Sequence, residues 1–343
     1  MARPDFPRSM AEFQTRFASD DSCRSYLMAC RWPDGFRCPG CGDRGSYPLA
    51  TRDLLQCRAC RRQTSVTAGT VLDRTRLPLP LWFAAAYLVT THTPGFSALQ
   101  LQRQLGLARY ETAWTMLHKP RRAIGLCPIP RRDVSAADRI RPERARLSGT
   151  VELDETIDGT AVDPVPQGMA STLRGHRVGA VEEGRRGGRQ RDSKKSILAG
   201  AVEVRGHGSG RIRLAVVPDL SAATFARFAE EAIAPGSTVL TDGWLSYRAL
   251  RGSYQHQPTV IGDPKNAAKQ LPRVHRAFAN LKTWLLGTHH GVGAKHLPHY
   301  VDEFVFRFNR RRTPMAAFQS LLGLTTRHTP TTYQMLYAAE PTG

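Results

Sequence analysis

Two pairs of cysteines carry the clearest chemical signal in this sequence. Cys38 and Cys41 are separated by two residues, as are Cys57 and Cys60, and 15 residues lie between the pairs. Two thiolates in a CxxC turn can grip one ion, and two such turns complete a tetrahedral sulfur shell that suits Zn²⁺. Redox-active thiols are the alternative, but two CxxC pairs in one small unit favour a structural zinc ribbon.

Acidic residues gather at two strand-like segments of an otherwise basic chain. The stretch VELDETIDG, residues 151–159, contains Asp154, and the apolar run STVLT, residues 237–241, leads into Asp242. We expect each aspartate to follow a strand, at the edge of a sheet where the sites of mixed α/β folds assemble. Two carboxylates converging there would repel unless a cation lay between them, and Mg²⁺ prefers oxygen ligands. The alternatives are a helix N-cap for Asp154 and an Asp-Gly turn for Asp242.

A third ligand is expected from a helix that the apolar spacing predicts over residues 274–286. His275 and Lys282 are seven positions apart, so they share one face of that helix, about 10 Å apart along its axis. This spacing lets His275 reach a metal while Lys282 reaches a phosphate of the same strand. Taken alone, His275 would be an ordinary helix residue and Lys282 a solvated charge.

The charge of the chain indicates what such a metal site would act on. Among 343 residues, 49 are Lys or Arg and 29 are acidic, so the formal net charge is +20. An excess of this size predicts a polyanionic partner, usually nucleic acid, although a solvated basic surface or an acidic membrane surface are alternatives. The longest apolar run, 81–89, is far shorter than the roughly 20 residues of a membrane span. With no apolar signal core at the N-terminus, we expect a cytoplasmic, nucleoid-associated protein.

Two short helices are predicted between the cysteine pairs and the acids. Ser97 can cap a helix that ends near Gly106, and a second helix is expected over 109–122. Its inward residues would be Ala113, Met116 and Leu117. This arrangement fits a helix-turn-helix, and a plain helical hairpin between domains is the alternative.

Several basic segments are candidates for contact with a phosphate backbone. They are the linker 128–149, the glycine-rich loop 184–195 and the arginine run that ends a helix predicted at 296–310. For that run the alternative is a solvated helix terminus with favourable charge placement. The candidate DNA-binding residues are Arg109, Lys119, Arg121, Arg122, Arg185, Arg186, Arg310, Arg311 and Arg312.

The elements that must position the acids alternate between strands and helices. The sequence predicts a strand at 151–154, an antiparallel pair at 196–205 and 211–217, and a strand at 237–241, with helices at 221–234, 244–250, 274–286 and 296–310. This pattern is typical of a mixed sheet with packed helices.

Six stretches, taken in order, resemble bacterial insertion-sequence transposases with an N-terminal zinc ribbon and a DDE-type catalytic domain of ribonuclease-H-like fold. They are RWPDGFRCPGCG, the second CxxC, VELDETIDG, VLTDGWLSY, NLKTWLLGTHHGV and YVDEFVFRFNRRR, and they span about residues 20–315. The resemblance implies double-strand DNA cleavage at element ends and strand transfer into a target. It also implies a dimer or higher oligomer on DNA.

The resemblance places the first two acids of the family on Asp154 and Asp242. The third falls on His275, because 275 − 242 = 33 fits the family spacing, and the basic residue two helical turns later falls on Lys282. His275 departs from the usual Glu. Imidazole is a softer ligand than carboxylate, so this variant would accept Mn²⁺ better than Mg²⁺.

The expected organisation is a multidomain α/β protein with five parts. They are an N-terminal helix and zinc ribbon (1–70), a helix-turn-helix-like region (71–127), a basic linker (128–149), a ribonuclease-H-like DDE-type domain (150–315) and a C-terminal tail (316–343). The expected function is that of a DNA transposase using structural Zn²⁺ and catalytic Mg²⁺ or Mn²⁺. The alternatives are a non-catalytic DNA-binding regulator derived from a transposase and a structure-specific nuclease.

Overall fold

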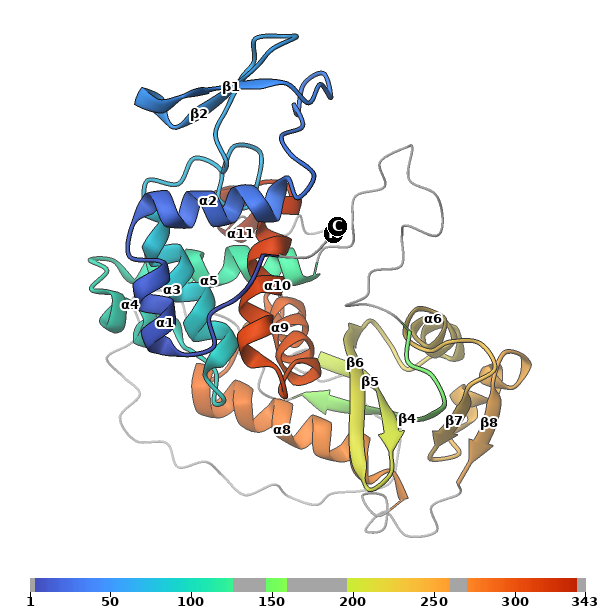
Figure 1. The fold of residues 1–343 in the computed structure, drawn as a ribbon. Coiled ribbons are helices and arrows are strands. Elements are labelled where there is room, and N and C mark those ends of the chain that lie inside the picture. The colour runs from blue at the N-terminus through green and yellow to red at the C-terminus, as the bar shows by residue number, and fades with distance from the viewer. Residues whose placement is uncertain (1–3, 126–145, 159–195, 260–269, 338–343) are drawn as a thin grey trace. The chain divides into compact units, whose positions relative to one another are not determined.

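The computed structural model describes residues 4–125, 146–158, 196–259 and 270–337. The chain divides into two compact units, whose elements are labelled in Figure 1. One unit combines Met1–Ala145 with Asp302–Gly343, and the other is Arg146–Val301.

The first unit opens with two helices whose starts are set by serine caps. They are α1 (Met10–Arg16) and α2 (Asp20–Arg31). The side chain of Ser9 accepts the backbone N–H of Glu12, and that of Ser19 accepts the N–H of Ser22. Each serine satisfies a helix N–H that has no partner within the helix.

A small antiparallel ribbon follows these helices. Its strands are β1 (Ser46–Leu49), β2 (Leu54–Cys57) and β3 (Gln63–Thr64), with β2 in the middle and a 3₁₀ turn, η1 (Ala50–Arg52), joining the first two. A sheet this small buries few side chains, namely Phe36, Cys38 and Cys57 with Trp32 and Leu55 packed against them. Its stability must therefore come from another source.

Three helices continue the first unit, and the second and third are those that the sequence predicts. They are α3 (Leu79–Thr91), α4 (Ala98–Leu105) and α5 (Tyr110–Gly125). Ser97 caps α4, and Gly106 ends it in the left-handed conformation with φ of 62°. The predicted inward residues of α5 are buried, namely Ala113, Met116 and Leu117. None of the described helices is long and apolar enough to cross a membrane.

The C-terminal residues do not follow the sequence-based boundaries. The stretch 316–343 was expected to be a tail, but α10 (Pro314–Arg327) belongs to the helical core and is followed by α11 (Tyr333–Tyr337). Phe318 of α10 is fully buried and its ring lies 5.7 Å from that of Phe13 and 5.9 Å from that of Phe83. Local spacing could not reveal this packing, because the partner rings come from the other end of the chain.

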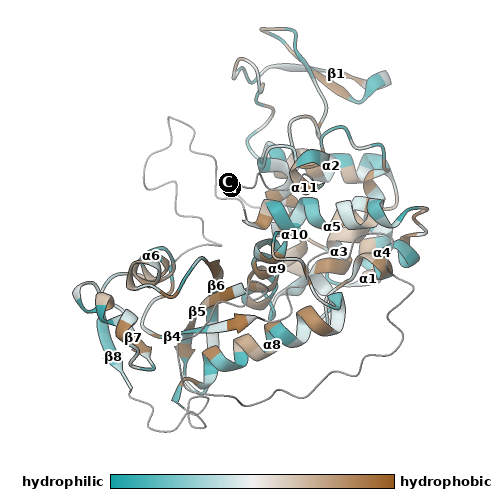
Figure 2. Cartoon of the chain, turned by 180° about the vertical axis from the view of Figure 1, so that it is seen from behind, coloured by the Kyte–Doolittle hydropathy of each residue, from teal (hydrophilic) through white to brown (hydrophobic). Residues whose placement is uncertain are grey.

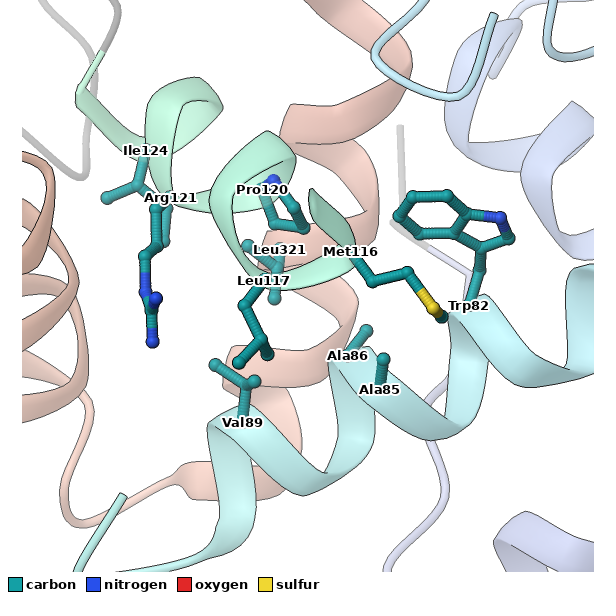
Figure 3. A pocket seen from close by; sticks show the side chains of 10 residues that line it. All are labelled: Trp82, Ala85, Ala86, Val89, Met116, Leu117, Pro120, Arg121, Ile124 and Leu321. Carbon is teal, nitrogen blue, oxygen red and sulfur yellow. The ribbon is translucent and has the colours of Figure 1, made fainter. Parts of the chain in front are cut away.

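A small pocket lies between three of these helices (Figure 3). It is lined by Trp82, Ala85, Ala86 and Val89 of α3, Met116, Leu117, Pro120, Arg121 and Ile124 of α5, and Leu321 of α10. Pro120 lies inside α5 and has no backbone N–H to continue the helix ladder. The lining is almost wholly apolar, so the pocket is a gap in the core packing.

The second unit is built on a five-stranded mixed sheet in the order β6-β5-β4-β7-β8. Its strands are β4 (Thr150–Asp158), β5 (Ser196–Arg205), β6 (Gly208–Val217), β7 (Thr238–Thr241) and β8 (Gln255–Pro258). β5 pairs antiparallel with both β4 and β6, whereas β7 runs parallel to both β4 and β8. The central strand is β4, which carries the predicted acids.

Helices cover the two faces of β4. The odd-numbered residues Val151 and Leu153 pack in a core with α6 (Ala222–Ala232) and the 3₁₀ helix η4 (Leu245–Gly252). The even-numbered residues face α8 (Pro272–His289). Gly200, the register partner of Asp154 on β5, lets α8 approach closely, because a Cβ there would lie 2.6 Å from the ring of Phe278.

One strand of this sheet was not predicted from the sequence. The edge strand β8 reads QHQP and is hydrophilic (Figure 2), so it lacks the apolar alternation that predicts strands. The predicted hairpin 196–217 is confirmed, with a tighter turn than expected. The helix predicted at 296–310 is confirmed as α9 (Leu297–Asn309).

Candidate active site and zinc centre

The four cysteines of the ribbon converge on one point. Their sulfur atoms all lie within 4.8 Å of one another, and Cys38 Sγ is 3.6 Å from Cys60 Sγ. Tetrahedral Zn²⁺ with Zn–S bonds of about 2.3 Å would place its sulfurs about 3.8 Å apart. The backbone N–H of Cys41 donates to Cys38, which lowers the pKa of that thiol to about 6. The donor set and its spacing fit zinc.

The sequence predicts that Asp154 follows the end of its strand, but in the structure Asp154 lies within β4. β4 continues to Asp158, so the predicted strand end at 154 is wrong. The residues beyond 154 extend the strand because they pair with β5, down to Asp158 opposite Ser196. The side chain of Asp154 is buried and projects on the even-numbered face, toward α8.

The register of the parallel strands directs the end of β7 toward the same region of the sheet. Thr150, Val151 and Glu152 of β4 pair with Thr238, Val239 and Leu240 of β7. Continuing this register by two residues would set Asp242 opposite Asp154, and Asp242 is the first residue after β7. The predicted position of Asp242 at a strand end is therefore confirmed.

His275 enters from the first turns of α8. Its Nε2 lies 3.3 Å from Oδ2 of Asp154, and about a third of its side chain is exposed. Burial lowers the pKa of His275, although the negative charges of Glu152 and Asp242 oppose the shift. Burial thus favours the neutral imidazole, which is the form that can donate a lone pair to a metal.

Asp242 does not close a three-ligand cluster with this pair. One of its carboxylate oxygens accepts the backbone N–H of Trp244 at 3.0 Å, which fixes the turn after β7. Gly243 occupies that turn with φ of 83°, a conformation that favours glycine. Among the residues that the structure describes, the four cysteines are the only group of three or more such ligands positioned to hold an ion.

Lys282 faces the same strand as His275, two helical turns further along α8. Its Nζ donates to Oγ1 of Thr156 at 2.8 Å, and Thr156 lies two residues beyond Asp154 on the even-numbered face. The predicted shared face of His275 and Lys282 is thus confirmed. The ammonium group of Lys282 therefore lies on the same face of β4 as Asp154 and is held by the hydroxyl of Thr156.

Glu155 points to the opposite face of the sheet. Its carboxylate accepts a hydrogen bond from the hydroxyl of Tyr247, which is fully buried in η4. Burial, followed by the charge of Glu155, raises the pKa of Tyr247, so the phenol remains protonated. Glu155 therefore anchors η4, and sequence reasoning gave no signal for this partner.

Sequence reasoning also missed Glu152. Its side chain is fully buried, and its carboxylate accepts the backbone N–H groups of Arg273 and Val274 at 2.7 and 2.9 Å. The guanidinium of Arg273 adds a charged hydrogen bond at 2.8 Å. The partners are 121 and 122 positions away, so no local pattern could have found them.

The predicted DNA-binding residues of α5 have different environments. Arg109 is exposed, whereas Lys119 is half-buried with its Nζ 5.8 Å from the ring centre of Trp82. Arg122 donates to the carbonyl of Met335 in α11. Tyr337 of α11 also contacts α5, through the ring of Trp114 and the hydroxyl of Thr115. Part of the outward face of the predicted recognition helix is therefore covered by α11.

Arg121 contradicts the prediction that it contacts DNA. Only 2% of its side chain is exposed, and it forms a salt bridge with the fully buried Glu303 of α9. Arg307 lies on the other side of the same carboxylate, 3.8 Å away. A guanidinium enclosed in this way cannot reach a phosphate. Arg121 lies four residues after Leu117 and so on the buried face of α5, although its charge is typical of a surface residue.

The arginine run after α9 is exposed at Arg311 and Arg312 and half-buried at Arg310. Arg310 and Arg311 lie 4.1 Å over the rings of Phe306 and Phe308, which holds their guanidinium groups in place. Arg312 is exposed. The predicted residues Arg185 and Arg186, and most of the linker 128–149, lie outside the described residues.

Comparison of the sequence with known proteins shows which family it matches. The ISXO2-like transposase domain matches residues 146–309, and the transposase zinc-ribbon domain matches residues 18–63. A similar protein is the "Uncharacterized protein in transposable element ISH50" of Halobacterium salinarum. It is 26% identical over 309 residues, which are 87% of this chain and 94% of the relative.

The chain belongs to the insertion-sequence transposase family. The two matched domains correspond to the two candidate metal centres of this transposase. The zinc-ribbon match covers all four cysteines, and the transposase-domain match contains Asp154, Asp242 and His275. It begins at residue 146, where the second compact unit begins.

Proposed function

We propose that this transposase cleaves phosphodiester bonds at the ends of its own element and joins the freed ends to target DNA, using a divalent metal. The observation that carries this proposal is the meeting of Asp154 with His275, Oδ2 to Nε2 at 3.3 Å, beside the strand that leads into Asp242. These groups lie in a chain of net charge +20, which suits a polyanionic substrate.

The proposed fold of the second unit is ribonuclease-H-like. Its support is the five-stranded order β6-β5-β4-β7-β8, with three antiparallel strands followed by two parallel ones. The first acid then lies on the central strand, the second after the neighbouring parallel strand, and the third ligand on the helix that packs across them.

The residues of the site divide the work between metal and substrate. Asp154, Asp242 and neutral His275 would hold Mg²⁺ or Mn²⁺, with imidazole favouring Mn²⁺. When bound, the metal would activate water or a 3′-hydroxyl and stabilise the leaving oxygen. Lys282 would bind a phosphate oxygen beside the scissile bond, oriented by Thr156.

The remaining parts would bind and organise DNA. We propose that Zn²⁺ holds the ribbon through its four cysteines and has a structural role. Candidate phosphate contacts are Arg109, Lys119, Arg122, Arg185, Arg186, Arg310, Arg311 and Arg312. Because strand transfer needs two ends held together, the working form would be a dimer or higher oligomer on DNA.

The test compares cleavage and binding on one substrate. A supercoiled plasmid carrying the genomic sequences that flank the reading frame is incubated with protein and Mg²⁺ or Mn²⁺. Asp154→Ala and Asp242→Ala should each abolish cleavage while leaving DNA affinity intact. Cleavage that survives in either variant would refute the proposal.

The same assay separates the alternatives. A non-catalytic regulator would bind the flanking sequences without metal-dependent cleavage. A structure-specific nuclease would cleave without producing joined target DNA. The role of His275 is tested by His275→Ala, which we expect to lose most cleavage with Mg²⁺ and Mn²⁺ alike. Full cleavage by His275→Ala would exclude it as a ligand.

A further inference from the structure

Glu152 is a buried acid with no part in the metal chemistry proposed above. It lies two residues before Asp154 on the same face of β4, and its side chain is fully buried. A carboxylate in such a place is costly unless its charge is matched and its oxygens are hydrogen-bonded. Three hydrogen bonds from α8 meet this need, two from backbone N–H groups and one from the guanidinium of Arg273.

These bonds are those of a helix cap supplied from a distant strand. The first N–H groups of any helix lack partners within it, and a side chain at the N-cap usually accepts one. Here the N-cap is Leu271, whose side chain has no acceptor, and the next residue is Pro272. Glu152 accepts the following two N–H groups instead. Its negative charge also suits the positive end of the helix dipole.

Arg273 also connects the start of α8 to a second part of the sheet. Besides pairing with Glu152, its guanidinium donates to the carbonyls of Gly206 and Gly208, at the turn between β5 and β6. The first turn of α8 is therefore tied both to the central strand and to the neighbouring hairpin. We call Glu152 and Arg273 together the α8 clamp.

The clamp lies directly beside the candidate site. His275 is the residue after Val274, whose N–H is bound by Glu152, and Asp154 is two residues after Glu152. A rotation or shift of the first turn of α8 would therefore move the imidazole away from the carboxylate. Groups that orient metal ligands in this way commonly affect metal affinity by about 10–100-fold.

We propose that Glu152 is a positioning residue, which with Arg273 fixes the start of α8 so that His275 meets Asp154 in a geometry that binds metal. This inference rests on the proposed metal-dependent function. It assigns to Glu152 no contact with metal or DNA. It predicts that losing the clamp weakens metal binding in protein that is still folded.

The experiment uses Glu152→Gln with Glu203→Gln as a matched control. Glu203 is also buried, on neighbouring β5, and also forms a salt bridge with an arginine, Arg211. The carboxylate of Glu203 accepts hydrogen bonds from Ser148, Arg205 and Arg211, which all lie outside α8. Both variants remove one buried charge from the same sheet, but only Glu152→Gln weakens the clamp, because the amide keeps a single acceptor oxygen and would set its NH₂ group against the guanidinium of Arg273.

Two readouts are taken at a temperature where each variant is fully folded. Mn²⁺ affinity is measured by electron paramagnetic resonance, and backbone hydrogen exchange is followed for the peptide that covers the first turn of α8. Glu152→Gln should raise the Mn²⁺ dissociation constant about 10–100-fold and speed exchange in that peptide. Glu203→Gln should change neither.

The outcomes separate failure of this inference from failure of the proposed function. Faster exchange in Glu152→Gln with unchanged Mn²⁺ affinity overturns the positioning role. Equal loss of affinity in Glu203→Gln also overturns it, since the effect would then be general destabilisation. If the unmodified protein binds no Mn²⁺, the proposed metal site itself fails, and the exchange data still report whether the clamp exists.

A second variant keeps the test usable if Glu152→Gln does not fold. Arg273→Met removes the charged partner but leaves both backbone N–H groups for Glu152 to accept. We expect a smaller rise in the Mn²⁺ dissociation constant than for Glu152→Gln, and Arg273→Lys should recover part of it. An Arg273→Met protein with unchanged affinity and unchanged exchange would show that the ion pair plays no part in the clamp.

Discussion

The two candidate metal centres of this transposase are assembled in opposite ways. The cysteine ligands lie within one short stretch of chain, on turns that each supply a pair, and their sulfurs already meet within 4.8 Å. The acidic centre would take its ligands from β4, the turn after β7 and α8, at positions 154, 242 and 275. Its geometry depends on strand register and on how α8 packs.

This difference explains what each centre requires from the rest of the fold. The ribbon has almost no core, so its metal must stabilise it. The acidic centre stands on a sheet with a sizeable buried core, but small displacements of α8 would change its shape. Disruption of the zinc centre should therefore unfold the ribbon, whereas disruption of the acidic centre should displace its side chains without unfolding the sheet.

Removal of zinc should have the largest effect. Structural Zn²⁺ contributes about 10–16 kcal/mol to folding in zinc-finger peptides, so Cys57→Ser should leave the ribbon unfolded. Zinc content measured by mass spectrometry should fall to none, and hydrogen exchange across residues 38–64 should become fast. Exchange in the sheet unit should not change.

Asp154→Asn is the matched comparison for that variant. It should retain both zinc and the protection of the ribbon, because Asp154 belongs to the other unit. Stoichiometric zinc in Cys57→Ser would contradict the four-cysteine site.

Arg121 allows the next largest effect to be tested, in the helical unit. Breaking a buried ion pair by removing one partner typically costs about 3–5 kcal/mol, so Arg121→Met should lower the free energy of unfolding in urea by that amount. Arg122→Met, one position away and partly exposed, should change it by less than about 0.5 kcal/mol. If both variants lowered the free energy of unfolding by the same small amount, Arg121 would instead be a surface residue.

These cases indicate which features a single sequence can predict. The zinc ligands, the helices α4 and α5, and the spacing of His275 and Lys282 follow from local pattern, because turns, caps and helical periodicity act over a few residues. The partners of Glu152, Glu155 and Arg121 are 92 to 182 positions away and follow only from packing. The place of Asp154 within β4 was missed for the same reason, since pairing with β5 extends the strand.

Gly200 tests the packing on which the acidic centre depends. A Cβ at this position would lie 2.6 Å from the ring of Phe278 on α8 and 2.9 Å from the side chain of Leu214, so Gly200→Ala must displace these side chains and should push against α8. Overpacking of this kind costs about 1–3 kcal/mol, measured as loss of stability in urea, and Mn²⁺ affinity should fall with it.

Gly287→Ala is the control on the same helix. A Cβ there meets nothing within 4 Å, so this variant should gain up to about 1 kcal/mol from helix propensity. A Gly200→Ala protein with unchanged affinity would show that the acidic centre tolerates movement of α8.

The smallest expected effect concerns Glu203 and acid stability. Burial alone would raise its pKa, but hydrogen bonds and charge from Arg211, with the N–H of Ser148, outweigh burial and lower the pKa below its ordinary value of 4.5. A carboxyl with a lowered pKa contributes stability that is present above pH 4.5 and is lost as pH falls through the folded-state pKa. Urea unfolding measured from pH 6 down to pH 3 should therefore show a smaller decline for Glu203→Gln than for the unmodified protein. Because Glu203 has no bond to α8, the Mn²⁺ affinity of that variant at pH 7 should be unchanged, which would separate a residue that only stabilises this sheet from one that aligns its site.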